Sequence, residues 1–183
     1  MDVIDALFWS NVTCHLLLLA GAAWCVVFPA RRIYPMNSKG GVYYLMWLMF
    51  WFVFGSNFAL VVLDWNTGAW EGPLRFMLGV PIALLGGGLV SWGITTLGVR
   101  NTSALPDGLI TSGPYAFTRN PQYVGDILLF TGVSVIANSE MVLVTHVLTS
   151  LVFVVAPLAE EPWLDGQYGD PYREYRSRVP RFL

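Results

Sequence analysis

The sequence carries little charge for its length. Of its 183 residues only 12% are Asp, Glu, Lys or Arg, whereas 55% are hydrophobic. A soluble domain carries roughly 25% charged residues. The composition therefore predicts an integral membrane protein, and the length suits a single domain over residues 1–183.

Hallmarks of other protein classes are also scarce. The net charge of −2, without long basic clusters, argues against nucleic acid as a partner. Cys14 and Cys25 lie in one apolar run, too far apart on a helix to form a disulfide. His15 and His146 match no metal-ligand spacing, so we expect packed, hydrogen-bonded histidines and no metal. Apolar residues begin near Ala6 without a preceding basic segment, which argues against a cleaved signal peptide.

Apolar runs dominate what is present. Several approach the roughly 20 residues that span a bilayer as a helix. They occupy residues 6–28, 42–63, 74–97, 122–137 and 141–159. We predict an all-α polytopic bundle of about five transmembrane helices. Only Asn138-Ser139-Glu140 separates the last two runs, which predicts an antiparallel hairpin. Residues 1–97 hold the first three helices, and residues 98–183 the expected functional core.

The third run has two features that need an interpretation. Pro81 is expected to kink the helix, which buried spans tolerate. The triple glycine at 86–88 favours close contact with a neighbouring helix. A phosphate-binding loop is a poorer explanation, because no strand precedes the glycines and no P-loop pattern surrounds them.

The basic residues predict an orientation. If the N-terminus lies outside and the chain alternates across the membrane, nine of the ten basic residues fall on one face. Only Arg75 falls on the other. Because Arg and Lys accumulate on the cytoplasmic face, we expect the C-terminus to be cytoplasmic.

The segment 113–126, GPYAFTRNPQYVGD, carries the first group of candidate functional residues. Asn120-Pro121 predicts a helix start, with Asn as the N-cap and Pro at the first helical position. A helix N-terminus suits an anion, and Arg119 adds a cation whose fork fits a carboxylate. A helix beginning there would bring Arg119, Tyr123 and Asp126 onto one stripe. Asp126 is a site candidate because ionisable residues inside a span are usually functional.

A second polar group, Glu160-Glu161-Pro162-Trp163, follows the last apolar run. Two carboxylates at a cytoplasmic helix end are unusual, and they suit a cation or sugar hydroxyls. Pro162 is expected to restart the chain. Asp170-Pro171 then predicts a further, interfacial helix, with Tyr168, Tyr172 and Tyr175 on one stripe. We expect segment 113–126 and the two acids to meet in one cavity at the cytoplasmic face.

These motifs resemble a known family. LITSGPYAFTRNPQYVGD, the twin Glu, and the closing GQYGDPYREYRSRVPR are similar to the isoprenylcysteine carboxyl methyltransferases and phospholipid N-methyltransferases. The resemblance covers about residues 98–183. Asn120 stands where the isoprenylcysteine type usually has His, as in the phospholipid type. The Tyr and Val-Pro-Arg segment looks more like the isoprenylcysteine type, so the class of methyl acceptor stays open.

The resemblance implies S-adenosylmethionine as cofactor and a lipophilic acceptor, with membrane lipid as surroundings. Arg119 and the helix start would hold the cofactor carboxylate, and the twin acids its ammonium and ribose hydroxyls. Tyr115, Tyr123 and Trp163 would line an adenine pocket. Arg119, Glu161 and Asp126 are the candidate catalytic residues, for orienting a carboxylate acceptor or deprotonating an amine. The candidate cofactor-binding residues are Gly113, Pro114, Tyr115, Arg119, Asn120, Pro121, Tyr123, Gly125, Glu160, Glu161 and Trp163.

Two other functions compete with a methyltransferase. An NADPH-dependent reductase of the sterol type has a similar C-terminal half, but the Glu-Glu-Pro sequence here argues against it. A non-catalytic membrane binding or scaffold protein is the other alternative.

Overall fold

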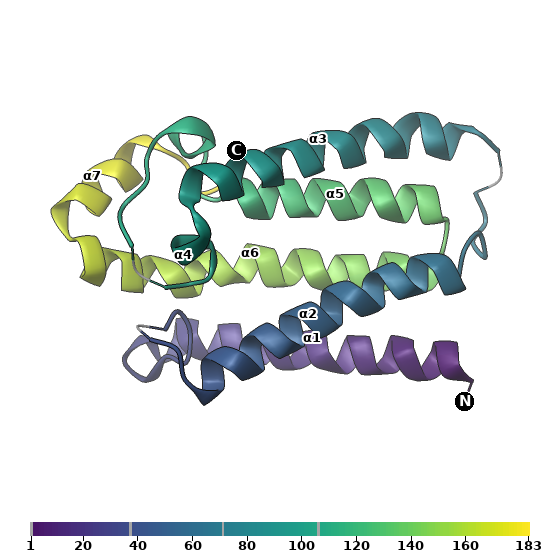
Figure 1. Cartoon of the computed structure of the whole chain (residues 1–183), viewed down its shortest axis with the longest axis horizontal. Coiled ribbons are helices and arrows are strands. Elements are labelled where there is room, and N and C mark those ends of the chain that lie inside the picture. The colour runs from purple at the N-terminus through teal and green to yellow at the C-terminus, as the bar shows by residue number, and fades with distance from the viewer. Residues whose placement is uncertain (1, 37, 71, 106) are drawn as a thin grey trace.

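The chain folds into a bundle of helices (Figure 1). The structure is a computed structural model that describes residues 2–36, 38–70, 72–105 and 107–183. No strand occurs within these ranges, which confirms the all-α prediction. The helices are α1 (Val3–Val27), η1 (Pro29–Arg31), α2 (Gly41–Leu63), α3 (Leu74–Leu97), α4 (Val99–Thr102), η2 (Gly113–Ala116), α5 (Pro121–Ala137), α6 (Glu140–Tyr168) and α7 (Asp170–Arg178).

Four helices are long and apolar enough to cross a membrane: α1, α2, α3 and α6. They mark the protein as an integral membrane protein. The expected fourth span is the shorter α5, of 17 residues. It begins only at Pro121 because the preceding polar residues fold into the site at the end of the bundle. Large apolar side chains such as Trp51 and Leu84 are mostly exposed, as expected of a surface that faces lipid.

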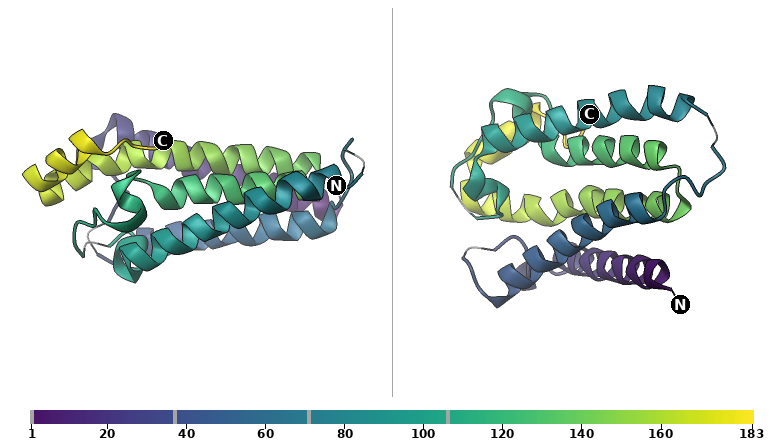
Figure 2. Two further views of the ribbon diagram at one scale, coloured as in Figure 1. Left: turned by 90° about the horizontal axis from the view of Figure 1, so that it is seen from above. Right: turned by 45° about the vertical axis from the view of Figure 1, so that its right-hand side comes forward.

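The long helices run up and down between two ends of the bundle. Figures 1 and 2 agree in placing α5 between α3 and α6, and α1 packs against both α6 and α2. The α1–α2 connection, α4, η2 and α7 lie at one end. The α2–α3 connection and the α5–α6 turn lie at the other, where the chain also begins. The predicted α5–α6 hairpin is confirmed. Asn138 adopts a left-handed conformation, and the Ser139 hydroxyl accepts a hydrogen bond from Val142 N at 3.0 Å.

The tip of that hairpin is fastened to the α2–α3 connection. Asn138 Nδ2 donates to Asn66 Oδ1 at 2.9 Å, and the Arg75 guanidinium donates to the same oxygen. Arg75 also lies 4.7 Å from the Phe76 ring centroid, a cation–π distance. Arg75, the one basic residue expected on the far face, therefore has a structural role, because it helps to hold the α2–α3 connection.

Helices α3 and α5 make their closest approach through glycine. A Cβ built on Gly86 would lie 2.3 Å from Leu129 N, and one on Gly132 would lie 2.4 Å from Ala83 N. By contrast, no atom of the described part of the chain lies within 4 Å of a Cβ built on Gly88, and a Cβ on Gly87 would meet a Leu129 side-chain atom at 3.9 Å. The helix-contact interpretation of the triple glycine therefore holds for Gly86 alone.

Helix α6 differs from its prediction. We expected the apolar helix to end near residue 159 and Pro162 to restart the chain, but α6 continues without interruption to Tyr168. Pro157 and Pro162 both lie inside it. The carbonyl of Leu158 loses its intrahelical donor at Pro162, yet the helix persists because its sides remain packed. The twin acids therefore lie on a rigid helix and not in a loop.

The two histidines are buried in polar contacts, as expected. His15 Nε2 lies 2.8 Å from Thr149 Oγ1, which joins α1 to α6. His146 Nε2 lies 3.0 Å from Thr131 Oγ1, which joins α6 to α5. The cysteines, Cys14 and Cys25, are free and buried.

The glycine contact predicts a position-specific effect of added bulk. We expect Gly86→Ala to lower the free energy of unfolding by about 1–3 kcal/mol, because the new methyl group must push α5 away. Gly88→Ala is the matched control in the same helix and should change it by less than about 0.5 kcal/mol. Thermal unfolding in detergent measures both. Equal effects of the two substitutions would contradict the close contact.

Candidate functional site

The first side of the site is the turn that precedes α5. Gly113 adopts φ +60, a left-handed conformation that favours glycine, and opens η2. Pro114 is fully buried beneath the turn. The helix start at Asn120-Pro121 is confirmed, with Asn120 at the N-cap position. Its side chain does not cap the helix, however. Nδ2 donates instead to the carbonyl of Arg181 at 2.9 Å, because the C-terminal segment lies against this turn.

Glu161 on α6 forms the second side and bridges two arginines. Arg119 Nη2 lies 3.0 Å from Glu161 Oε1. Arg181 holds both carboxylate oxygens, with Nε at 2.7 Å and Nη2 at 2.8 Å. The side chains of Arg119 and Glu161 are only 9% and 12% exposed, so water screens this pair little. Hydrogen bonding to Glu161 raises the pKa of Arg181 further above its ordinary value.

Backbone contacts hold the C-terminal segment in the same place. Arg119 N donates to the Pro180 carbonyl at 2.9 Å, and Thr118 Oγ1 donates to the Arg181 carbonyl at 3.1 Å. Tyr175 on α7 donates to the Tyr115 carbonyl at 2.7 Å. The turn before α5, the end of α6 and the C-terminal segment therefore form one connected unit.

Glu160, the other acid, faces a different set of partners. The hydroxyls of Tyr34 and Tyr123 both donate to its Oε1. Tyr34 lies in the α1–α2 connection, so this contact joins the N-terminal helices to the site. Burial, together with the adjacent Glu160 carboxylate, raises the pKa of Tyr34 well above its ordinary value. Tyr34 therefore remains a protonated donor at neutral pH.

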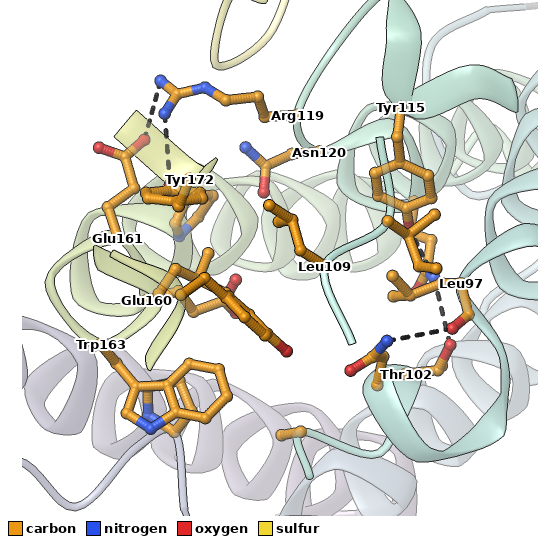
Figure 3. Close-up of a pocket in the computed structure, with 18 of the residues that line it drawn as sticks. Leu97, Thr102, Leu109, Tyr115, Arg119, Asn120, Glu160, Glu161, Trp163 and Tyr172 are labelled. Carbon is orange, nitrogen blue, oxygen red and sulfur yellow. Dashed lines mark hydrogen bonds and ion pairs between the residues drawn. The ribbon is translucent and has the colours of Figure 1, made fainter. Parts of the chain in front are cut away.

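These groups surround a small cavity of about 150 Å³ (Figure 3). The figure shows Arg119 and Asn120 extending from the turn before α5 toward Glu161 on α6, with Tyr172 beneath the arginine. Burial raises the pKa of Tyr172 and of Tyr175 to about 12, so both phenols stay neutral. Of the predicted residues, those that line the cavity are Tyr115, Arg119, Asn120, Tyr123, Glu160, Glu161 and Trp163.

The other predicted residues lie outside this cavity. Gly113, Pro114 and Pro121 shape the turn, and Gly125 faces α3, where a Cβ would lie 2.8 Å from Val90 N. Asp126 lines a separate cavity. The expected stripe of Arg119, Tyr123 and Asp126 is therefore divided, because Arg119 precedes the helix and only Tyr123 reaches both spaces.

The second cavity is larger, about 750 Å³, and mostly apolar. Its lining residues come from α1, α2, α3, α5 and α6 and from the connections beside them. The two cavities share five lining residues, which form a neck between them: Tyr34, Thr102, Ala104, Gln122 and Tyr123. Gln122 Nε2 donates to Thr102 Oγ1 at 3.3 Å and to Tyr115 OH at 3.0 Å, so one side of this neck is also polar and ordered.

Sequence reasoning missed several residues of the site. Arg181 and Tyr172 lie in motifs that were recognised, but nothing in their spacing predicted contact with Glu161. No pattern in the sequence indicated that Tyr34 belongs to the site, because it lies in a short connection among basic residues. Among the described residues, no group of three or more His, Cys, Asp or Glu side chains is arranged to hold a metal ion.

The chain is similar to several known proteins. It is 34% identical to a protein-S-isoprenylcysteine O-methyltransferase of Xenopus laevis over 86 residues, which are 46% of this chain and 30% of the relative. It is 36% identical to the enzyme of that name in Schizosaccharomyces pombe over 76 residues, 39% of this chain and 31% of the relative. It is 30% identical to the cobalt-zinc-cadmium resistance protein CzcN of Cupriavidus metallidurans over 130 residues, 69% of this chain and 59% of the relative. The matches thus span between about a third and three fifths of these curated relatives. No solved structure matches the chain.

Fold and site together define a polytopic helical membrane protein with two adjoining cavities. The one at the end of the bundle is called the polar cavity, because Arg119, Glu160 and Glu161 lie in its lining, and the other is mostly apolar. The sequence model for phospholipid methyltransferases matches residues 74–171, more than half of the chain. The protein belongs to the phospholipid methyltransferase family. The matched segment begins at α3 and includes the turn before α5 and both acids.

The bridging role of Glu161 predicts a stability effect. We expect Glu161→Gln to lower the free energy of unfolding by on the order of 3 kcal/mol, because two buried or half-buried guanidinium groups lose their carboxylate. Glu174→Gln removes an exposed partner of Arg178 and should cost less than about 1 kcal/mol. Thermal unfolding in detergent without added ligands compares the two. Similar shifts in melting temperature would contradict the central position of Glu161.

Proposed function

We propose that the protein is an S-adenosylmethionine-dependent methyltransferase that acts on a lipophilic acceptor. The observation that carries this proposal is the pair of adjoining cavities, one with charged side chains in its lining and one mostly apolar, which share five lining residues. Such a pair suits a reaction between a polar cofactor and a membrane-soluble substrate. Membership of the phospholipid methyltransferase family and similarity to two isoprenylcysteine O-methyltransferases support it.

The polar cavity fits the chemical groups of the cofactor. The Nε atom of Arg119 is buried and has no hydrogen-bond partner among the residues that the structure describes, so one guanidinium donor remains for a carboxylate. Asn120 adds an amide beside it. Glu160, oriented by Tyr34 and Tyr123, suits an ammonium or ribose hydroxyls, since carboxylates bind ribose in nucleotide folds. Three aromatic side chains in the lining could contact an adenine: Tyr115, Tyr123 and Trp163.

Glu161 acts in this proposal mainly through Arg119. Its carboxylate already receives Arg119 and Arg181, so it holds the arginine in place and offsets its charge. The polar cavity, at about 150 Å³, is smaller than the 300–1,000 Å³ of most ligand sites. The loop carrying Leu109 and helix α7 line it, so these are the segments that we expect to shift when the cofactor binds.

The cofactor would supply an electrophilic methyl group on a positively charged sulfonium. The chain then has two tasks, alignment and the exclusion of water. The neck at Tyr34, Tyr123 and Gln122 is where an acceptor from the apolar cavity would meet that methyl group. The basic residues at this end of the bundle favour a cytoplasmic site, with the N-terminus outside, so the cofactor would enter from the cytosol and the acceptor from the membrane.

Calorimetric titration in detergent tests the proposal against its two alternatives. We expect binding of S-adenosylhomocysteine and no binding of NADPH. Arg119→Ala and Glu160→Gln should each weaken S-adenosylhomocysteine binding by about tenfold or more, since charged hydrogen bonds are typically worth about 1.5–3 kcal/mol. Arg173→Ala, at an exposed ion pair on α7, is the control and should bind normally.

The remaining outcomes separate the classes of protein. Binding of NADPH alone would favour a reductase, and binding of neither ligand a non-catalytic membrane protein. Wild-type affinity for S-adenosylhomocysteine in both Arg119→Ala and Glu160→Gln would show that the cofactor binds elsewhere.

A further inference from the structure

Asp126 is the charged residue of the apolar cavity. It lies on α5, about a turn and a half into the helix, and lines the 750 Å³ space. No Arg, Lys or His is among the described residues that line this cavity. Nor does Asp126 have a hydrogen-bond or ion-pair partner among the residues that the structure describes. Asp126 is half-buried, and a carboxylate that lines an apolar space without a partner favours a bound group that supplies donors or positive charge.

The walls around Asp126 also suit a cation. Trp47 lines the same cavity and contributes an aromatic ring to its wall. Aromatic faces attract ammonium groups, most strongly where water is excluded. Aromatic side chains from three helices, α2, α5 and α6, line the cavity: Tyr43, Trp47, Phe50, Trp51, Phe54, Tyr123 and Phe153.

An acceptor with an anionic group would meet unfavourable charge in both cavities. The polar cavity beyond the neck is lined by Glu160, Glu161 and Arg119, and in the proposed complex the remaining donor of Arg119 is occupied by the cofactor carboxylate. A lipid carboxylate or phosphate in the apolar cavity would therefore face Asp126 with no free cation among the described lining residues. A neutral hydroxyl would leave the charge of Asp126 without a counter-ion.

We propose that the methyl acceptor is a lipophilic amine without an anionic headgroup, and that Asp126 binds its nitrogen. This proposal rests on the methyltransferase function and names the substrate class. It departs from the acceptors that the relatives' names imply, a prenylated cysteine or a phospholipid.

The proposed reaction balances as follows. The ammonium form of the acceptor gives one proton to the Asp126 carboxylate, which leaves a free amine. The nitrogen then forms a bond to the methyl carbon of the sulfonium donor. The carbon–sulfur bond breaks, and its electron pair remains on sulfur as a thioether. The product is a methylammonium, and the proton on Asp126 later passes to solvent.

Equilibrium binding tests the recognition step apart from turnover. The protein in lipid nanodiscs is titrated with radiolabelled dodecylamine and, separately, with dodecanoate. We expect the amine to bind at least tenfold more tightly than the acid. Asp126→Asn should weaken amine binding about tenfold while leaving S-adenosylhomocysteine affinity unchanged, which also shows that the variant is folded. Glu140→Gln, at an exposed acid on the far end of α6, is the control and should bind like the wild type.

Transfer of labelled methyl groups provides the second measurement. Dodecylamine should be methylated faster than phosphatidylethanolamine, and dodecanoate should not be methylated. Equal binding of amine and acid, or unchanged amine binding in Asp126→Asn, would overturn the proposal. Faster methylation of phosphatidylethanolamine would overturn the exclusion of anionic headgroups. Asp126-dependent amine binding without any S-adenosylhomocysteine binding would instead refute the methyltransferase function and leave the amine site standing.

Discussion

The ion bridge at Glu161 is the interaction on which the site depends. One carboxylate receives Arg119 from the turn before α5 and Arg181 from the C-terminal segment. Three segments that are distant in sequence meet there, and each brings other groups with it. Arg119 is followed by Asn120, the Arg181 carbonyl accepts a hydrogen bond from Asn120, and α6 carries Glu160. A buried ion pair contributes little net stability, but removal of one partner is costly, so the bridge fixes an arrangement more than it stabilises the fold.

The bundle explains why a membrane protein can place such polar groups together. Glycine permits close contact between α3 and α5, and α5 begins only at Pro121 because the polar residues before it fold into the site. The polar residues then face one another and not the lipid. Tyr34 extends this arrangement to the N-terminal helices, because its hydroxyl reaches Glu160 from the α1–α2 connection. The neck between the cavities is thus built by both halves of the chain.

The sequence predicted structure correctly where a local pattern has a single common structural meaning. Apolar runs predicted the helices, Asn138-Ser139 the hairpin, and Asn120-Pro121 the start of α5. It was less informative where tertiary contact overrides a local signal. Pro162 lies within α6, because packing maintains a helix that proline alone would end. Asn120 bonds to the C-terminal segment instead of capping its helix. Tyr34 could not be found, since its role depends on a contact with Glu160 across 126 residues.

The most direct measurement of the central claim is photoaffinity labelling with an azidoadenosine analogue of S-adenosylmethionine, followed by mapping of the labelled peptide. If the turn before α5 and the two acids form one cofactor cavity, the label should fall on the segments around Tyr115 and Trp163, and excess S-adenosylhomocysteine should prevent it. Labelling confined to the far end of the bundle, around the α2–α3 connection, would contradict the account.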